Sequence, residues 1–168
     1  MLKPRAYFLS LCCIFNATSA IADIEVPMYT TEKSDTGKAV GSISISETEF
    51  GLLFTPKLHG LKPGIHGFHI HENPACGHNG MDAGGHLDPN KSGKHLGPYN
   101  NKGHLGDLPT LYVNTDGTAN NPVLAPRLKH LSELQYHSLM IHEGGDNYSD
   151  QPDKLGGGGL RMECGIIE

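Results

Sequence analysis

Glycine or proline occupies about every fifth position of this chain, and this frequency restricts its fold more than any other feature. The 168 residues include 22 glycines and 11 prolines. Both residues interrupt helices, because glycine adds backbone freedom and proline lacks an N–H donor. The length suits one domain with its own core. We therefore predict a single domain of short strands and turns, and exclude a helical bundle or coiled coil.

Apolar and polar residues alternate in several short segments, which is the pattern of half-buried strands. Strands are predicted at 24–29, 40–46, 51–58, 67–71, 111–113, from 118 onward, at 138–141 and at 160–167. Pro27 suggests that the first strand lies at a sheet edge. Residues 73–109 and 143–159 are rich in glycine and lack the alternation, so both are predicted to be long loops. About eight strands and two long loops favour an all-β fold, an antiparallel sandwich or barrel.

The first 22 residues differ in character from the rest of the chain. Lys3 and Arg5 precede a short apolar run, and Ala20-Ile21-Ala22 has the small residues of a cleavage site. This pattern predicts a secretory signal peptide that is cut after Ala22, with the domain at 23–168. A buried N-terminal helix and a lipid anchor on Cys12 are the less favoured alternatives. No later segment has the length and apolar character of a membrane span.

Removal of residues 1–22 changes both the charge and the cysteine content. It leaves 11 basic and 18 acidic residues, a net charge of −7, which argues against a nucleic-acid partner. Only Cys76 and Cys164 remain. In an exported, periplasmic protein a single disulfide is the default expectation, and two buried free thiols are the alternative. A bond closing a loop this long is worth about 4–5 kcal/mol in the chain-entropy model.

Histidine is unusually frequent, at 11 residues against 13 lysines and arginines. His69 and His71 are two apart in a predicted strand, so their side chains share a face. Imidazole nitrogens with one carboxylate oxygen are donors suited to zinc. The candidate donors are His69, His71, His86, His95, His104, Asp107 and His142. Two four-coordinate metals need eight bonds from these seven donors, so either one position is open to water or one imidazole bridges both metals.

Five longer motifs are similar to those of a known family. They are Gly67-Phe68-His69-Ile70-His71-Glu72, Gly84-Gly85-His86-Leu87-Asp88-Pro89, Gly103-His104-Leu105-Gly106-Asp107-Leu108-Pro109, Ile141-His142-Glu143-Gly144-Gly145-Asp146-Asn147 and Gly159-Leu160-Arg161-Met162-Glu163-Cys164-Gly165. In this order they resemble copper/zinc superoxide dismutase, above all its exported bacterial branch. The likeness extends from about Ile24 to the C-terminus. It implies a flattened eight-stranded Greek-key barrel, an architecture of the β-sandwich kind.

The resemblance also implies a role for each motif residue. Copper would take His69, His71, His86 and His142, and zinc would take His86, His95, His104 and Asp107. His86 would then be the bridging imidazolate and would also carry a catalytic proton. Asp146 would accept hydrogen bonds from one ligand of each metal. Arg161 would attract the anionic substrate beside the copper, and Cys76 and Cys164 would form the family disulfide.

The implied activity is the conversion of superoxide to O2 and H2O2 by a chain that is a monomer or a homodimer. Three alternatives remain open at this stage: a copper or zinc storage protein or chaperone, a zinc hydrolase with a three-histidine site, and a structural module stabilised by zinc. The other histidines have simpler interpretations. His66 is expected to be structural, His59, His130 and His137 to lie at the surface, and His78 to bind no metal.

Overall fold

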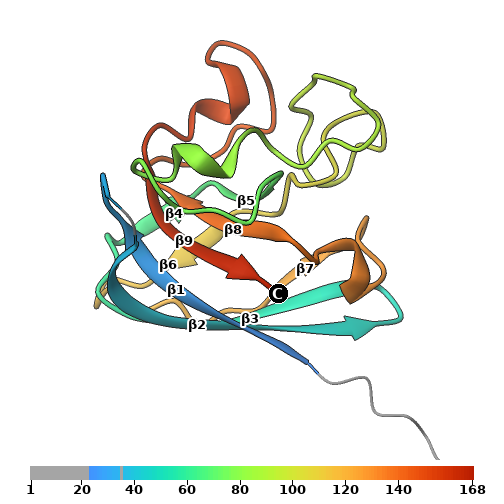
Figure 1. Cartoon of the computed structure of the whole chain (residues 1–168). Coiled ribbons are helices and arrows are strands. Elements are labelled where there is room, and N and C mark those ends of the chain that lie inside the picture. Colours follow the sequence, from blue (N-terminus) through green and yellow to red (C-terminus); the bar gives the residue numbers. More distant parts are fainter. Residues whose placement is uncertain (1–22, 35) are drawn as a thin grey trace, which may run out of the picture.

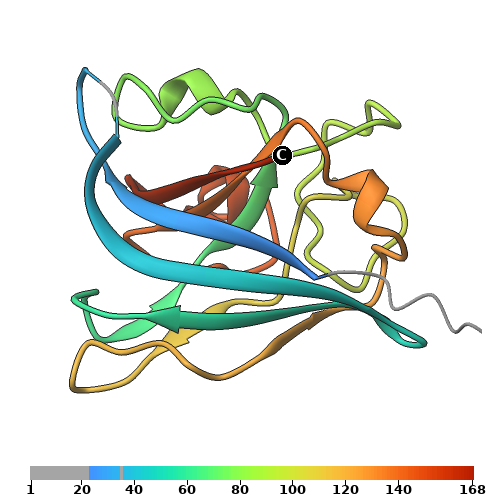
Figure 2. The same ribbon diagram turned by 60° about the horizontal axis from the view of Figure 1, so that its bottom comes forward.

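The computed structural model describes residues 23–34 and 36–168, and it shows an all-β fold. One antiparallel sheet runs in the order β5-β8-β9-β1-β2-β3-β7, and β4 and β6 form a second, two-stranded sheet. The strands are β1 (Ile24–Thr31), β2 (Thr36–Thr48), β3 (Gly51–Leu58), β4 (Gly64–His66), β5 (Phe68–His71), β6 (Leu111–Val113), β7 (Val123–Ala125), β8 (His137–His142) and β9 (Arg161–Ile167). Figure 2 shows how the seven-stranded sheet curls around the interior. The predicted antiparallel barrel is therefore confirmed.

The described residues contain nine strands where about eight were expected, because β4 was not predicted; Gly67 separates it from β5. Before it, β4 pairs with β6, and after it, β5 pairs with β8. The backbone of Gly67 itself bonds to Gly144 and His142. The predicted strand from 118 onward was also wrong in its start, since β7 begins only at Val123. The strands at 51–58 and 111–113 have the predicted bounds, and the other predicted strands are present with shifted ends.

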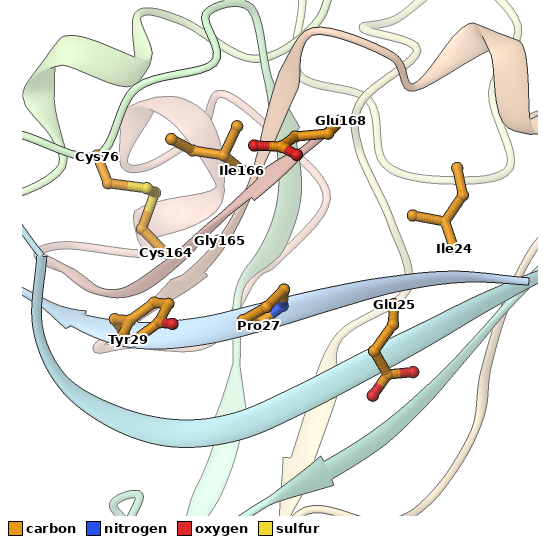
Figure 3. Close-up of a pocket in the computed structure, with 9 residues that line it drawn as sticks. All are labelled: Ile24, Glu25, Pro27, Tyr29, Cys76, Cys164, Gly165, Ile166 and Glu168. Atoms are coloured by element: carbon orange, nitrogen blue, oxygen red, sulfur yellow. A yellow bond between two sulfur atoms is a disulfide. The ribbon is translucent and has the colours of Figure 1, made fainter.

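The expectation that the first strand lies at an edge was wrong, and the pairing of β1 explains why proline is tolerated there. β1 lies between β2 and β9, but it pairs with β9 only at Tyr29 and Thr30. Beyond these residues the two strands form no further pairs and separate toward their ends. The N–H that proline lacks is therefore not needed for a hydrogen bond to β9 at position 27. A pocket of about 370 Å³ opens in this gap, beside the disulfide (Figure 3). No histidine lines it.

The core is built from alternate residues of the long strands. Val26 and Met28 of β1, Ile43 and Ile45 of β2 and Phe54 of β3 are fully buried in one hydrophobic cluster. Burial of each such side chain contributes about 1.5–3 kcal/mol. This core provides the rigid support on which β5, β8 and β9 carry functional residues.

Three short 3-10 helices interrupt the loops: η1 (Met81–Ala83), η2 (Leu131–Glu133) and η3 (Lys154–Gly157). The segments 72–110 and 143–160 lie on the same side of the sheet, next to β5, β8 and β9 (Figure 1). The expected disulfide is confirmed: Cys76 and Cys164 are bonded, with Cα atoms 5.8 Å apart across 88 residues. It ties the first long loop to β9. The predicted signal peptide, its cleavage site and Cys12 lie outside the described residues, and no helix within the described ranges is long and apolar enough to cross a bilayer.

Candidate metal centre

The two long loops and the ends of β5 and β8 bring the candidate donors to one place. His69 and His71 come from β5, and His142 is the last residue of β8. The loop residues are pinned to β5 by short bridges, His86 opposite His71 and Asp107 opposite His69. All seven predicted donors are buried: His69, His71, His86, His95, His104, Asp107 and His142. These bridges hold the loop donors next to the strand that carries His69 and His71.

Four histidines form a first cluster, which we call the four-histidine group. One ring nitrogen from each lies within 4.8 Å of the others: His69, His71, His86 and His142. The rings of His69 and His86 are stacked with centroids 4.0 Å apart, and those of His71 and His142 are stacked at 5.6 Å. Four buried imidazoles whose ring nitrogens converge in this way could hold a cation among them.

The second cluster surrounds one carboxylate oxygen, and we call it the Asp107 group: Asp107, His86, His95 and His104. The Oδ1 atom of Asp107 lies 2.9 Å from Nδ1 of His86, 3.1 Å from Nδ1 of His95 and 3.4 Å from Nδ1 of His104. The backbone N–H groups of Leu96 and Gly97 donate to its other oxygen. By distance alone His69 also falls with His86, His95 and Asp107. We count His69 with the four-histidine group, to which it also belongs, and His104 with the Asp107 group, because its Nδ1 lies 3.4 Å from Asp107.

The hydrogen bonds of these residues indicate whether the side chains could hold metal ions, and their pattern favours metal binding. Six buried ring nitrogens have no hydrogen-bond partner among the described residues: Nδ1 of His69, His95 and His104, Nε2 of His71, and both nitrogens of His142. A buried polar atom without a partner costs about 1–3 kcal/mol, so six in one region favour bound ligands. The opposite nitrogens of His69, His71 and His95 are hydrogen-bonded. One anchored and one free nitrogen per ring is the arrangement of metal-binding histidine.

Asp146 connects the two clusters. Its Oδ2 accepts a hydrogen bond from Nε2 of His69 at 2.8 Å, and its Oδ1 accepts one from Nε2 of His95 at 2.8 Å. The backbone N–H of Tyr148 donates to the same Oδ1. These bonds fix the proton on Nε2 of both rings and leave Nδ1 free to bind a metal. In His71 the arrangement is reversed: the carbonyl of Gly84 accepts a hydrogen bond from Nδ1 at 3.0 Å, which leaves Nε2 free to bind a metal.

The protonation states also suit cation binding. Burial, reinforced by His69, lowers the pKa of His86 to about 3 and that of His142 to about 2. Both rings are therefore neutral near pH 7, the form that binds metals. Burial also lowers the pKa of His95, but the carboxylates of Asp107 and Asp146 outweigh it and raise that pKa to about 9. The carboxylates thus attract positive charge, which a metal ion can supply in place of the proton.

Arg161 lies at the edge of the four-histidine group. It pairs with His142 across β8 and β9, and its guanidinium donates to the carbonyls of Gly80 and Gly84 at 2.6 and 2.7 Å. Because Gly84 also accepts from His71, the arginine and a histidine of the group share one carbonyl. Arg161 lines a pocket of about 520 Å³ that opens to the surface. Burial lowers its pKa, but a guanidinium stays charged at any working pH.

The remaining histidines take no part in either cluster. His66 is buried, and its two ring nitrogens lie 2.7 Å from the carbonyl oxygens of Lys62 and His142, as a structural histidine would. His78 is exposed and its Nδ1 lies 2.8 Å from Asp82. His137 bonds the carbonyl of Glu72 at the surface. The cluster histidines are therefore distinguished by burial and by unpartnered nitrogens.

Two charged residues that the sequence analysis did not single out contact the backbone of the Asp107 group. Arg127 donates to the carbonyls of His104 and Gly103, and Asp150 accepts from the backbone N–H of His95. We call these residues the backbone clamps. No sequence signal marks them, because they act on main-chain atoms 23 to 55 positions away.

Comparison with known proteins agrees with this geometry. The sequence pattern of the family described as copper/zinc superoxide dismutase (SODC) matches residues 39–167. The chain is 62% identical over 160 residues to "Superoxide dismutase [Cu-Zn] 1" of Salmonella typhimurium, covering 89% of this chain and 90% of that protein. It is also similar to the structure of the Cu/Zn superoxide dismutase from Brucella abortus, with a TM-score of 0.84, 48% identity and coverage of 88% and 100%. A monomeric copper, zinc superoxide dismutase from Salmonella enterica is similar at a TM-score of 0.79 and 52% identity, with the same coverage.

Proposed function

Because this chain belongs to the copper/zinc superoxide dismutase family, we propose that the four-histidine group holds copper and the Asp107 group holds zinc, with His86 shared between them. The protein is an oxidoreductase that converts superoxide to O2 and H2O2, with copper and zinc as its cofactors. The observation that carries the residue assignment is the set of buried ring nitrogens without hydrogen bonds. These nitrogens belong to five of the seven proposed ligands: His69, His71, His95, His104 and His142.

The bridging role rests on the two nitrogens of His86. Its Nδ1 faces Asp107 at 2.9 Å, which leaves Nε2 for the four-histidine group. An imidazole that bridges two cations must lose both protons, and the low pKa of His86 agrees with easy loss of the first. Whenever Nε2 is free, it can hold a proton and hand it to the peroxide product. Nδ1 stays in the Asp107 group throughout and keeps the ring in place.

When bound, copper supplies one-electron redox chemistry for oxidising one superoxide ion and reducing a second, and zinc supplies charge without redox change. The protein's own residues bind and orient. Asp146 holds the rings of His69 and His95 at fixed angles. Arg161 provides a fixed positive charge that can attract an anion, since it pairs with His142 and shares the Gly84 carbonyl with His71. This charge is needed because the chain without residues 1–22 carries a net charge of −7.

We also propose that the chain is exported to the periplasm after cleavage behind Ala22, with 23–168 as the mature domain. The disulfide between Cys76 and Cys164 supports an oxidising compartment. Mass spectrometry of the protein from the periplasmic fraction tests this, and an N-terminus other than Asp23 contradicts the cleavage site.

The activity is tested by superoxide decay on protein loaded with both metals, before and after copper chelation. We expect rapid decay that copper removal abolishes and copper addition restores. Elemental analysis should find one copper and one zinc per chain. Loaded protein that binds both metals but leaves superoxide untouched would instead indicate a storage protein.

A further inference from the structure

We propose that the backbone clamps, Arg127 and Asp150, are positioning residues that set how tightly the Asp107 group retains its metal. This inference rests on the zinc assignment proposed above and extends it to two residues that are not metal ligands. Both act on the main chain of a donor, rather than on its imidazole ring.

The donors His95 and His104 need such support because their segment has little structure of its own. Residues 91–103 form no strand or helix. The backbone N–H of His104 donates to the carbonyl of Lys94, the residue before His95, at 3.0 Å. The ring of His95 is oriented by Asp146 at 2.8 Å, whereas the ring of His104 contacts the Asp107 carboxylate at the longer distance of 3.4 Å. Its position therefore depends on how its backbone is held.

Arg127 provides this hold for His104. Its two terminal nitrogens donate to the carbonyls of His104 and Gly103 at 2.7 and 3.0 Å. The planar guanidinium fork fixes both acceptors in one geometry, which a single flexible ammonium cannot do. Arg127 itself is well anchored, because it follows β7 and lies between the buried residues Ala125 and Leu128. The clamp thus connects the loop to the rigid barrel.

Asp150 holds the other donor from the second long loop. Its Oδ2 accepts from the backbone N–H of His95 at 2.9 Å, and its Oδ1 accepts from that of Leu155 at 3.2 Å. Both carboxylate oxygens are used, so one side chain joins the loop at 91–103 to the loop at 143–159. With the two clamps in place, the donors are already positioned before the metal binds, and binding does not have to order them.

The test measures zinc release from the copper- and zinc-loaded protein to a chromophoric chelator, and zinc affinity by competition with the same chelator. The variants are Arg127→Met and Asp150→Ala, with Arg127→Lys and Asp150→Asn as conservative partners. Lys129→Ala and Asp153→Ala are matched controls, since each removes the same charge from the same segment. The ammonium of Lys129 contacts the carbonyl of Phe50, away from the metal centre.

We expect Arg127→Met and Asp150→Ala to weaken zinc binding and accelerate its release about tenfold, the effect typical of residues that orient metal ligands. The conservative variants should show smaller effects, and the controls should match the wild type. The unfolding midpoint of the zinc-free protein is measured in parallel. A clamp role predicts faster zinc release with little change in that midpoint.

Three outcomes overturn the inference. Zinc release at the wild-type rate in both variants removes the clamp role but leaves the proposed function intact. Equal acceleration by the controls shows a general effect of charge. If the variants lower the unfolding midpoint of the zinc-free protein enough to account for the whole acceleration of zinc release, the residues support the fold rather than the site. If the wild type itself holds no zinc beside copper, the zinc assignment fails independently of Arg127 and Asp150.

Discussion

Replacing Glu163 with glutamine should stabilise the protein above neutral pH and have a much smaller effect in mild acid. Glu163 lies on β9, where it pairs with Ile141 of β8 and Thr30 of β1, and it is only 7% exposed. Burial raises the pKa of this carboxyl to about 7, and His66 opposes the shift only in part. At pH 8 the folded protein therefore carries a buried carboxylate that would be better solvated in the unfolded chain.

The size of the effect follows from the two pKa values. The rise from 4.5 to about 7 corresponds to about 3 kcal/mol, at 1.36 kcal/mol per unit. Because the folded state binds this proton more tightly, the contribution to stability is complete below about pH 4.5. It is lost as the pH rises to about 7 and is constant above that value. Glutamine resembles the protonated acid but does not titrate, so its advantage should be roughly 1 kcal/mol at pH 5 and about 3 kcal/mol at pH 8.

Urea unfolding of the metal-loaded protein with its disulfide intact, at pH values from 5 to 8, measures this difference. The metal ligands titrate alike in wild type and variant, so their contribution cancels in the comparison. Glu49→Gln, at an exposed position, is the control and should show no pH-dependent difference. An advantage of Glu163→Gln that is constant across this pH range, or a loss of stability that grows with pH, would refute the argument from burial.

Three further predictions concern the centre itself. Arg161→Ala should lower the rate of superoxide decay about tenfold or more, equivalent to at least ~1.4 kcal/mol, with copper still bound; a wild-type rate would assign the attraction of the anion to another residue. The wild-type rate should also fall as salt screens this charge over about 10 Å at 0.1 M. His86→Ala should weaken copper binding and remove the ligand that joins the two metal sites. His78→Ala should leave both sites occupied, and metal analysis after dialysis measures both outcomes. Cys164→Ser should speed the loss of both metals to a chelator, because the disulfide ties the donor-bearing loop to β9; unchanged retention would show that the loop holds itself.

The donor residues could be found from the sequence because their signals are local. Alternation in 67–71 puts His69 and His71 on one face of a strand, and motifs of six or seven residues surround the other donors except His95, which lies between two of them in the predicted long loop. The two cysteines left after the predicted cleavage site admit a single intramolecular bond. Such features depend on neighbouring residues and on counting, so no knowledge of the closed barrel is required.

Other features depend on how distant segments meet, and local patterns are silent about them. Pro27 was assigned to an edge because a proline rarely tolerates two partners, but the divergence of β1 from β9 is a property of the whole sheet. Likewise β4, in a segment where no strand was predicted, is formed by its pairing with the distant β6. Arg127 and Asp150 contact backbone atoms, which have no residue type to signal a partner. Only the closed barrel brings both loops to the same end of the molecule. There these two side chains form hydrogen bonds with residues 23 to 55 positions away.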